Sequence, residues 1–134
     1  MVDKLSTLTK VLVVEDSVLL SARIVNDIHA VGRFEVVATA DTESDAIKAI
    51  DHLCPDIVVT DLRLREGSGV DVLRYSQQSD CDPTPRVLVL TNYDSPVYRS
   101  HCLALGAAGV FDKSSEYRSF LQAMRGAVGS QAKH

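Results

Sequence analysis

The chain has 134 residues, of which 46% are hydrophobic and 24% are charged, and its formal net charge is −4. This length is enough for one domain that buries its own core without metals or disulfides. The sequence contains no basic run, so we expect no nucleic acid binding by this chain alone. It also contains no apolar run close to the roughly 20 residues of a membrane span, so we expect a cytoplasmic protein with no membrane partner.

The three cysteines are Cys54, Cys81 and Cys102, an odd number without CxxC or Cys/His ligand spacing. They lie in or beside apolar segments, which is typical of free thiols in a reducing compartment. The sequence therefore predicts neither a disulfide nor a zinc site.

Five apolar runs predict β-strands. Three of them are rich in Val and Leu and end at a polar residue: Lys10–Glu15, Asp56–Thr60 and Arg86–Thr91. Continuous apolar runs of this length are typical of strands buried on both faces of a parallel sheet. A fourth run, Phe34–Ala40, is less apolar, and the fifth, Gly109–Lys113, is short.

Helical patterns alternate with these strands. After the candidate N-caps Asp16 and Ser17, apolar residues recur at intervals of three and four, which predicts an amphipathic helix. The residues of this apolar stripe are Val18, Leu19, Ala22, Val25 and Ile28. Comparable patterns follow Thr42, Gly69, Pro96 and Ser115.

Strict alternation of strand and helix predicts an α/β fold. Five strand-helix units, (βα)5, give a doubly wound, five-stranded parallel sheet with right-handed crossovers and helices on both faces. No linker or internal repeat interrupts the pattern. We therefore expect one domain over residues 1–134, with a core at about 9–128 and short tails at both ends.

Polar residues stand where the predicted strands end. Glu15 and Asp16 follow the first strand, Asp61 the third, Thr91 ends the fourth, and Lys113 ends the fifth. The carboxyl ends of parallel strands meet at one edge of the sheet, where ligands of such folds bind. Three converging carboxylates cannot all stay ionised without a cation, and oxygen ligands suit Mg²⁺.

A magnesium ion beside a lysine and a hydroxyl suits phosphoryl transfer, in which the protein supplies position and electrostatics. Asp61 is the predicted acceptor because it stands alone after a continuous buried strand. It is followed by the polar, glycine-containing segment LRLREGSG, which can leave its face open. The adjacent pair Glu15 and Asp16 is better suited to the metal.

The order and spacing of these residues resemble the response-regulator receiver domain of two-component signalling. Asp61 lies 45 positions after Asp16, Thr91 lies 30 after Asp61, and Lys113 lies 22 after Thr91. These intervals are close to those of the family, and the resemblance extends over residues 9 to 128. It implies a fold like that of the chemotaxis regulators, with the flavodoxin-like strand order 2-1-3-4-5.

The resemblance also implies a role for each residue of the metal site. Asp16 is similar to the direct Mg²⁺ ligand of the family, and Glu15 to the residue that helps through water. Asp61 contributes its carboxylate, and Arg63 contributes its backbone carbonyl.

A second set of roles concerns the phosphoryl group. Asp61 resembles the phosphoacceptor, Lys113 the cation that contacts the phosphoryl oxygens, and Thr91 the hydroxyl that moves toward the new phosphate. Val110 departs from the family pattern, because many members carry a Tyr or Phe three residues before the lysine. A signal that usually passes through this aromatic ring would have to pass through the backbone.

We therefore expect a phosphorylation-dependent signalling switch and not an enzyme. A histidine kinase or a histidine phosphotransfer protein would be the donor. A downstream protein effector would bind the face formed by the fourth helix, fifth strand and fifth helix, and a second copy of the chain is another candidate partner. The alternative is the receiver part of a longer DNA-binding transcription regulator.

Other interpretations stay open at this point. Singly, Glu15 and Asp16 are typical of a helix cap, and Asp61 of a solvated turn. A small phosphatase with an aspartyl-phosphate intermediate would need a second acid for the leaving group, and Arg63 is not an acid. A flavin-binding module would need a hydroxyl-rich or glycine-rich loop after the first strand, where the sequence has EDSVLL.

Overall fold

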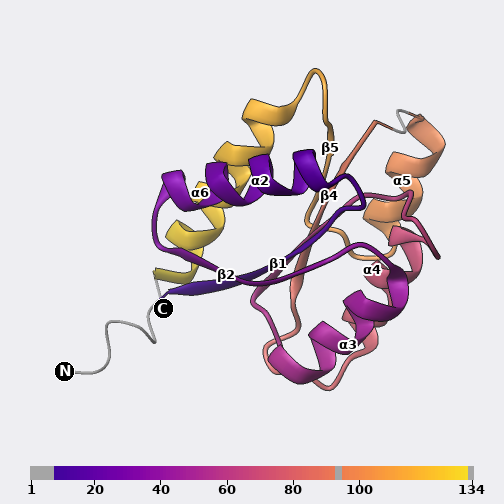
Figure 1. Ribbon diagram of the computed structural model, residues 1–134, viewed down its shortest axis with the longest axis horizontal. Helices are drawn as coiled ribbons and strands as arrows, with labels where there is room; N and C mark the ends of the chain where they lie inside the picture. Colours follow the sequence, from indigo (N-terminus) through magenta and orange to yellow (C-terminus); the bar gives the residue numbers. More distant parts are fainter. Residues whose placement is uncertain (1–7, 93–94, 133–134) are drawn as a thin grey trace.

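The computed structural model describes residues 8–92 and 95–132, and its centre is one parallel sheet (Figure 1). The strands are β1 (Thr9–Val14), β2 (Phe34–Ala40), β3 (Ile57–Thr60), β4 (Arg86–Thr91) and β5 (Gly109–Asp112). They lie in the order β2-β1-β3-β4-β5. The predicted fold and its implied strand order are therefore confirmed, with strand ends that differ from the prediction by at most one residue.

Helices cover both faces of the sheet (Figure 1). They are α2 (Val18–Val31), α3 (Glu43–Leu53), α4 (Gly69–Gln78), α5 (Pro96–Ala104) and α6 (Tyr117–Ala132). Helices α2 and α6 pack on one face, and α3, α4 and α5 on the other. Helix α6 continues past residue 128, where the core was expected to end. Over the described residues, no helix has the length and apolar character needed to cross a membrane.

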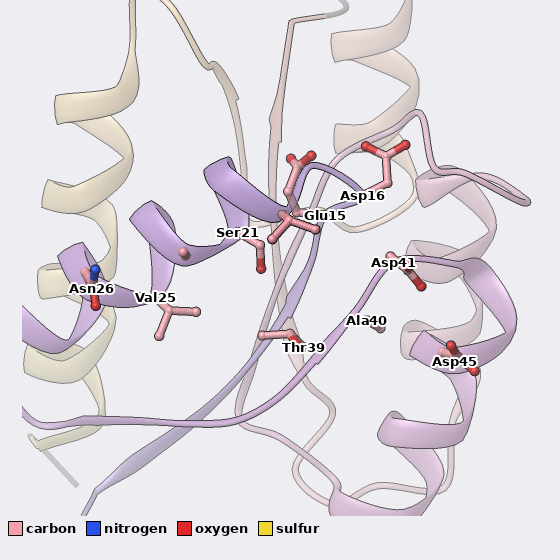
Figure 2. Close-up of a pocket in the computed structure, with 11 residues that line it drawn as sticks. Glu15, Asp16, Ser21, Val25, Asn26, Thr39, Ala40, Asp41 and Asp45 are labelled. Carbon is pink, nitrogen blue, oxygen red and sulfur yellow. The ribbon is translucent and has the colours of Figure 1, made fainter.

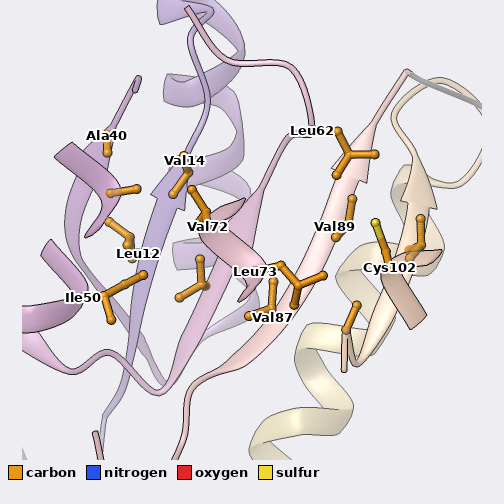
Figure 3. Close-up of a cluster of buried hydrophobic side chains, with 14 of the residues drawn as sticks. Leu12, Val14, Ala40, Ile50, Leu62, Val72, Leu73, Val87, Val89 and Cys102 are labelled. Carbon is orange, nitrogen blue, oxygen red and sulfur yellow. The ribbon is translucent and has the colours of Figure 1, made fainter. Parts of the chain in front are cut away.

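The two faces of the sheet bury separate apolar clusters. Successive side chains of a strand point to opposite faces, so Leu12 and Val14 join the cluster under α3, α4 and α5 (Figure 3). Val11 and Val13 join the cluster under α2 and α6. All four side chains are almost completely buried, which confirms that β1 is covered on both faces.

The expected apolar stripe of α2 is wrong at three of its five residues, because Val18, Leu19 and Ala22 are exposed. Val18 and Leu19 are 82% and 85% exposed, whereas Ile24 and Ile28 are buried. Each helical residue turns the side-chain direction by about 100°, so Leu20, Ile24 and Ile28, which are four apart, share the face that packs on the sheet. Val18 and Leu19 lie two and one such steps before Leu20, so neither points to that face.

The prediction of three free cysteines is also wrong. Cys54 and Cys81 form a disulfide with a Cα–Cα distance of 5.4 Å, and only Cys102 among the three is a free, buried thiol. Cys54 ends α3 in a left-handed conformation, and Cys81 lies between α4 and β4. Helices α3 and α4 cover the same face of the sheet, so this packing brings together two cysteines that are 27 positions apart.

Candidate functional site

The polar residues that follow the strands meet at one edge of the sheet. Backbone bonds extend the sheet beyond the strand ends, because Glu15 N donates to Ala40 O at 2.9 Å and Asp61 N donates to Val14 O at 3.0 Å. Single ligand atoms of Glu15, Asp16 and Asp61 lie within 4.8 Å of one another. The expected convergence of three carboxylates is therefore present in the structure.

Lys113 joins two of these carboxylates. Its Nζ lies 2.8 Å from Oε1 of Glu15 and 2.6 Å from Oδ2 of Asp61. Burial raises the pKa of Glu15, and the hydrogen bond from Lys113 offsets only part of that effect. Burial alone would lower the pKa of Lys113, but its bonds to Asp61 and Glu15 outweigh burial and raise it. The lysine therefore stays charged between the two carboxylates.

Backbone amides fix the other oxygen of each buried carboxylate. Oδ1 of Asp61 accepts hydrogen bonds from Leu62 N at 2.6 Å and from Arg63 N at 3.4 Å. Oε2 of Glu15 accepts one from Ser17 N at 2.9 Å. These bonds to ionised oxygens are stronger than bonds between neutral groups, so they hold both carboxylates in a fixed orientation.

The donor set fits a hard divalent cation. Three carboxylates and one ammonium leave a net double negative charge at the cluster. Asp16 is exposed, and its side chain makes no hydrogen bond to any residue that the structure describes, so its oxygens are available to a ligand. Carboxylate oxygens with room for water are the environment that Mg²⁺ prefers.

A cavity of about 560 Å³ opens beside the acidic cluster. Figure 2 shows Glu15 and Asp16 at one end of it, α2 along one side, and the end of β2 along the other. Asp41 and Asp45 complete its acidic rim. Asp61 and Lys113 are not among its lining residues, so the cavity gives access to the Asp16 side of the cluster.

The segment between Asp61 and α4, residues 62–68, is attached to the start of α3. Glu43 N donates to Glu66 O at 2.9 Å, and Oε1 of Glu43 accepts from Ser68 N at 3.0 Å. The side chain of Arg65 pairs with Asp41 at 3.3 Å. Sequence reasoning missed Glu43, and the available signal was a carboxylate directly after the helix cap Thr42.

Two other predicted site residues lie at this edge. Thr91 ends β4, is 3% exposed, and accepts a hydrogen bond at its carbonyl from Lys113 N at 3.0 Å. Arg63 follows Asp61 closely, and its side chain is exposed. The role of the Thr91 hydroxyl and that of the Arg63 carbonyl stay predictions.

Val110, which stands where many members of the family carry an aromatic residue, is a buried core residue. Its carbonyl accepts a hydrogen bond from Nη1 of Arg99 at 2.6 Å. The other terminal nitrogen of that guanidinium, Nη2, donates a hydrogen bond to Oε1 of Glu116 at 2.8 Å. Arg99 thus ties α5 to β5 and to the start of α6, a link that sequence reasoning did not find.

Comparison with known proteins finds relatives that match most of this chain. GacA of Pseudomonas aeruginosa, a response regulator, is 29% identical over 122 residues, which are 91% of this chain and 56% of GacA. The transcriptional regulatory protein DegU of Brevibacillus brevis is 29% identical over 92 residues, 69% of this chain and 38% of DegU. The chain spans about half the length or less of these curated relatives.

A solved receiver domain has a similar fold. The signal receiver domain of the response regulator NarL from Mycobacterium tuberculosis superposes with a TM-score of 0.78 and 27% identity, over 94% of this chain and 97% of that one. Residues 11–125 match the response regulator receiver domain family. That match includes the whole acidic cluster and Lys113, and the chain therefore belongs to the response regulator receiver domain family.

Proposed function

We propose that this receiver is a phosphorylation-dependent switch in which Asp61 accepts a phosphoryl group from a phosphohistidine of a partner protein. The observation that carries the proposal is the contact between Lys113 and Asp61 inside a cluster of three carboxylates. Mg²⁺ held by Glu15, Asp16, Asp61 and the Arg63 carbonyl would offset the charge of the phosphoryl group.

The transfer needs little from the protein besides position and charge. A carboxylate oxygen of Asp61 attacks the phosphorus atom, the new O–P bond forms, and the N–P bond to the donor histidine breaks. The imidazole leaves with the bonding electron pair. Leu62 N holds Oδ1 of Asp61 in place during this step, and the ammonium of Lys113 lies close enough to Asp61 to contact the incoming phosphoryl oxygens.

Phosphorylation changes the charge that Lys113 must balance. The phosphate of an aspartyl phosphate carries about −1.5 to −2 charges at neutral pH in place of the single charge of the carboxylate, so Lys113 moves from its two carboxylates toward the phosphate. The Thr91 hydroxyl turns inward to the same group. The backbone amide of Lys113 donates a hydrogen bond to the carbonyl of Thr91. The movements of the Lys113 and Thr91 side chains therefore both act on the ends of β4 and β5. The face of α5, β5 and α6 then changes its affinity for an effector.

The relatives favour transcription as the output. DegU is named a transcriptional regulatory protein, and this chain covers 38% of it. We infer that the effector of this receiver is a DNA-binding domain, either elsewhere in a longer chain or on a separate protein. The net charge of −4 fits a chain that does not itself contact DNA.

Intact mass spectrometry tests the phosphoacceptor. The wild-type chain is incubated with acetyl phosphate or phosphoramidate, with and without Mg²⁺, beside Asp61→Asn and the control Asp45→Asn. We expect one added phosphoryl group, about 80 Da, in wild type and in Asp45→Asn when Mg²⁺ is present. Asp61→Asn and samples without Mg²⁺ should stay unmodified. Labelling of Asp61→Asn, or no labelling of wild type by either small donors or a histidine kinase, would contradict the proposal.

A further inference from the structure

The phosphoacceptor loop, residues 62–68, closes on itself directly beside Asp61. Gly69 N donates to Leu62 O at 2.9 Å, and Arg63 and Ser68 form an antiparallel bridge. A Cβ on Gly69 would lie 1.8 Å from the carbonyl oxygen of Asp61. The end of the loop is therefore in contact with the backbone of Asp61, and a shift at Ser68 is passed to Asp61 and Arg63.

Glu43 holds this loop from outside. Its carboxylate accepts the hydrogen bond of Ser68 N at 3.0 Å, and its own amide donates to Glu66 O at 2.9 Å. Between these two bonds lies Gly67, with a φ of +85° and no room for a side chain, because a Cβ there would lie 2.4 Å from Cβ and Oε1 of Glu43. One residue thus contacts the backbone at three successive loop positions, through its amide at Glu66 and through its side chain at Gly67 and Ser68.

The second attachment of the loop is weaker. Arg65 pairs with Asp41 at 3.3 Å, but the two side chains are 57% and 46% exposed, and exposed ion pairs contribute little. The Glu43 bond is partly buried and joins a charged acceptor to an amide, which makes it the stronger of the two. Glu43 is also the first residue of α3, where the helix dipole favours a carboxylate.

We propose that Glu43 is a positioning residue that fixes the phosphoacceptor loop, and through it the Arg63 carbonyl and the Asp61 carboxylate, in the geometry that binds Mg²⁺. The effect of Glu43 on phosphorylation rests on the proposed function. Its effect on the loop and on metal affinity is independent of phosphoryl transfer. Glu43 touches neither the metal site nor the phosphoryl group, so it acts only through the loop.

Three variants of Glu43 distinguish the effect of its hydrogen bond to Ser68 N from the effect of its negative charge. Glu43→Ala removes both the hydrogen bond and the charge. Glu43→Asp keeps the charge at the helix start but shortens the side chain, so that it no longer reaches Ser68 N. Glu43→Gln keeps an oxygen that accepts the bond. The matched control is Asp45→Ala, which removes a carboxylate from the same first turn of α3 without touching the loop.

The first measurement is amide hydrogen exchange in the metal-free protein, followed by Mg²⁺ titration calorimetry. We expect Glu43→Ala and Glu43→Asp to speed amide exchange at Ser68 and to raise the Mg²⁺ dissociation constant about tenfold. A tenfold change is the smallest typical effect of losing a residue that orients the ligands of a metal ion. Glu43→Gln and Asp45→Ala should match wild type. In Glu43→Ala and Glu43→Asp, phosphoryl labelling of Asp61 at limiting Mg²⁺ should fall together with the Mg²⁺ affinity, and it should recover at saturating Mg²⁺.

Two results would overturn the role of Glu43. One is a Mg²⁺ affinity of Glu43→Asp equal to that of wild type, and the other is an equal loss of affinity in Asp45→Ala and Glu43→Ala. If wild type takes no phosphoryl group at all, the proposed function fails instead, and the exchange and calorimetry still decide the role of Glu43.

Discussion

The ammonium nitrogen of Lys113 lies 2.6 Å from Oδ2 of Asp61, although the two residues are 52 positions apart in the chain. The same nitrogen lies 2.8 Å from Oε1 of Glu15. All three side chains are largely buried, with exposed fractions of 12% for Lys113, 8% for Asp61 and 3% for Glu15. One cation therefore balances two buried carboxylates that belong to different strand ends.

Replacing Lys113 by Met should make stability depend on Mg²⁺. Without the ammonium, Glu15 and Asp61 remain buried without a cation, which costs about 3 kcal/mol of unfolding free energy. Added Mg²⁺ should restore most of that loss, because it supplies the missing positive charge. Urea unfolding of wild type and Lys113→Met, each with and without Mg²⁺, measures this difference. The control is Lys48→Met on the exposed side of α3, and an equal loss under both conditions would argue against the prediction.

The strand ends could be predicted from the sequence because buried parallel strands carry a simple signal. Val11 to Val14 is a continuous apolar run followed by Glu15, and Ile57 to Val59 is one followed by Thr60 and Asp61. A polar residue directly after such a run must lie at the edge of the sheet, so Glu15 and Asp61 could be placed without knowing any tertiary contact. The order of the strands came only from the resemblance to a family.

The features that the sequence did not reveal depend on packing between elements. Val18 and Leu19 fit the same periodic pattern as Ile28, and only the direction in which α2 meets the sheet shows that they are exposed. Cys54 and Cys81 carry no spacing signal, because α3 and α4 bring them together. Glu43 contacts a loop that begins almost 20 positions later in the chain.

The Cys54–Cys81 disulfide should stabilise the protein measurably. A bridge that closes a loop of 27 positions removes enough entropy from the unfolded chain to contribute about 3 to 4 kcal/mol. Urea unfolding of wild type should shift to lower urea when dithiothreitol is added, and Cys54→Ser should match reduced wild type under both conditions. Alkylation of the unreduced, unfolded protein should modify one thiol, that of Cys102. Modification of all three cysteines would show that the bridge does not form.

The contact between Arg99 and Glu116 should set the pKa of that carboxyl. The hydrogen bond from Arg99 lowers the pKa of Glu116 below its ordinary value of 4.5, and a bond from Asp112 N adds to this effect. Arg99→Gln should therefore raise the pKa of Glu116 toward 4.5, which an NMR titration of the side-chain carboxyl carbon measures directly.

The same pair predicts how stability changes with pH. The pKa of Glu116 is lower in the folded chain than in the unfolded one, so its stabilisation is present above pH 4.5 and is lost as the pH falls through the folded value. The difference in unfolding free energy between wild type and Arg99→Gln should be constant near neutral pH and shrink in acid. Glu116→Gln should remove this acid dependence, and a difference that grows in acid would contradict the assignment.

Tyr117 should titrate at unusually high pH. Burial raises the pKa of its phenol above the ordinary value of 10.0, and the hydrogen bond to Oδ2 of Asp27 raises it further. That bond measures 2.7 Å, and the guanidinium of Arg23 lies 4.4 Å from the ring centroid. In a spectrophotometric titration of the four tyrosines, Tyr117→Phe should remove a component above the usual range.

The stability of the α2–α6 contact should fall in alkali for the same reason. Above pH 10 the unfolded chain loses the Tyr117 proton while the folded chain keeps it, so the unfolding free energy decreases as the pH rises. Tyr117→Phe should lose about 1 kcal/mol at neutral pH with its hydrogen bond and show a shallower alkaline decline than wild type. Asp27→Asn, which keeps an acceptor but removes the charge, should lower the pKa of Tyr117. An unchanged alkaline titration in both variants would mean that Tyr117 is not the buried phenol of this contact.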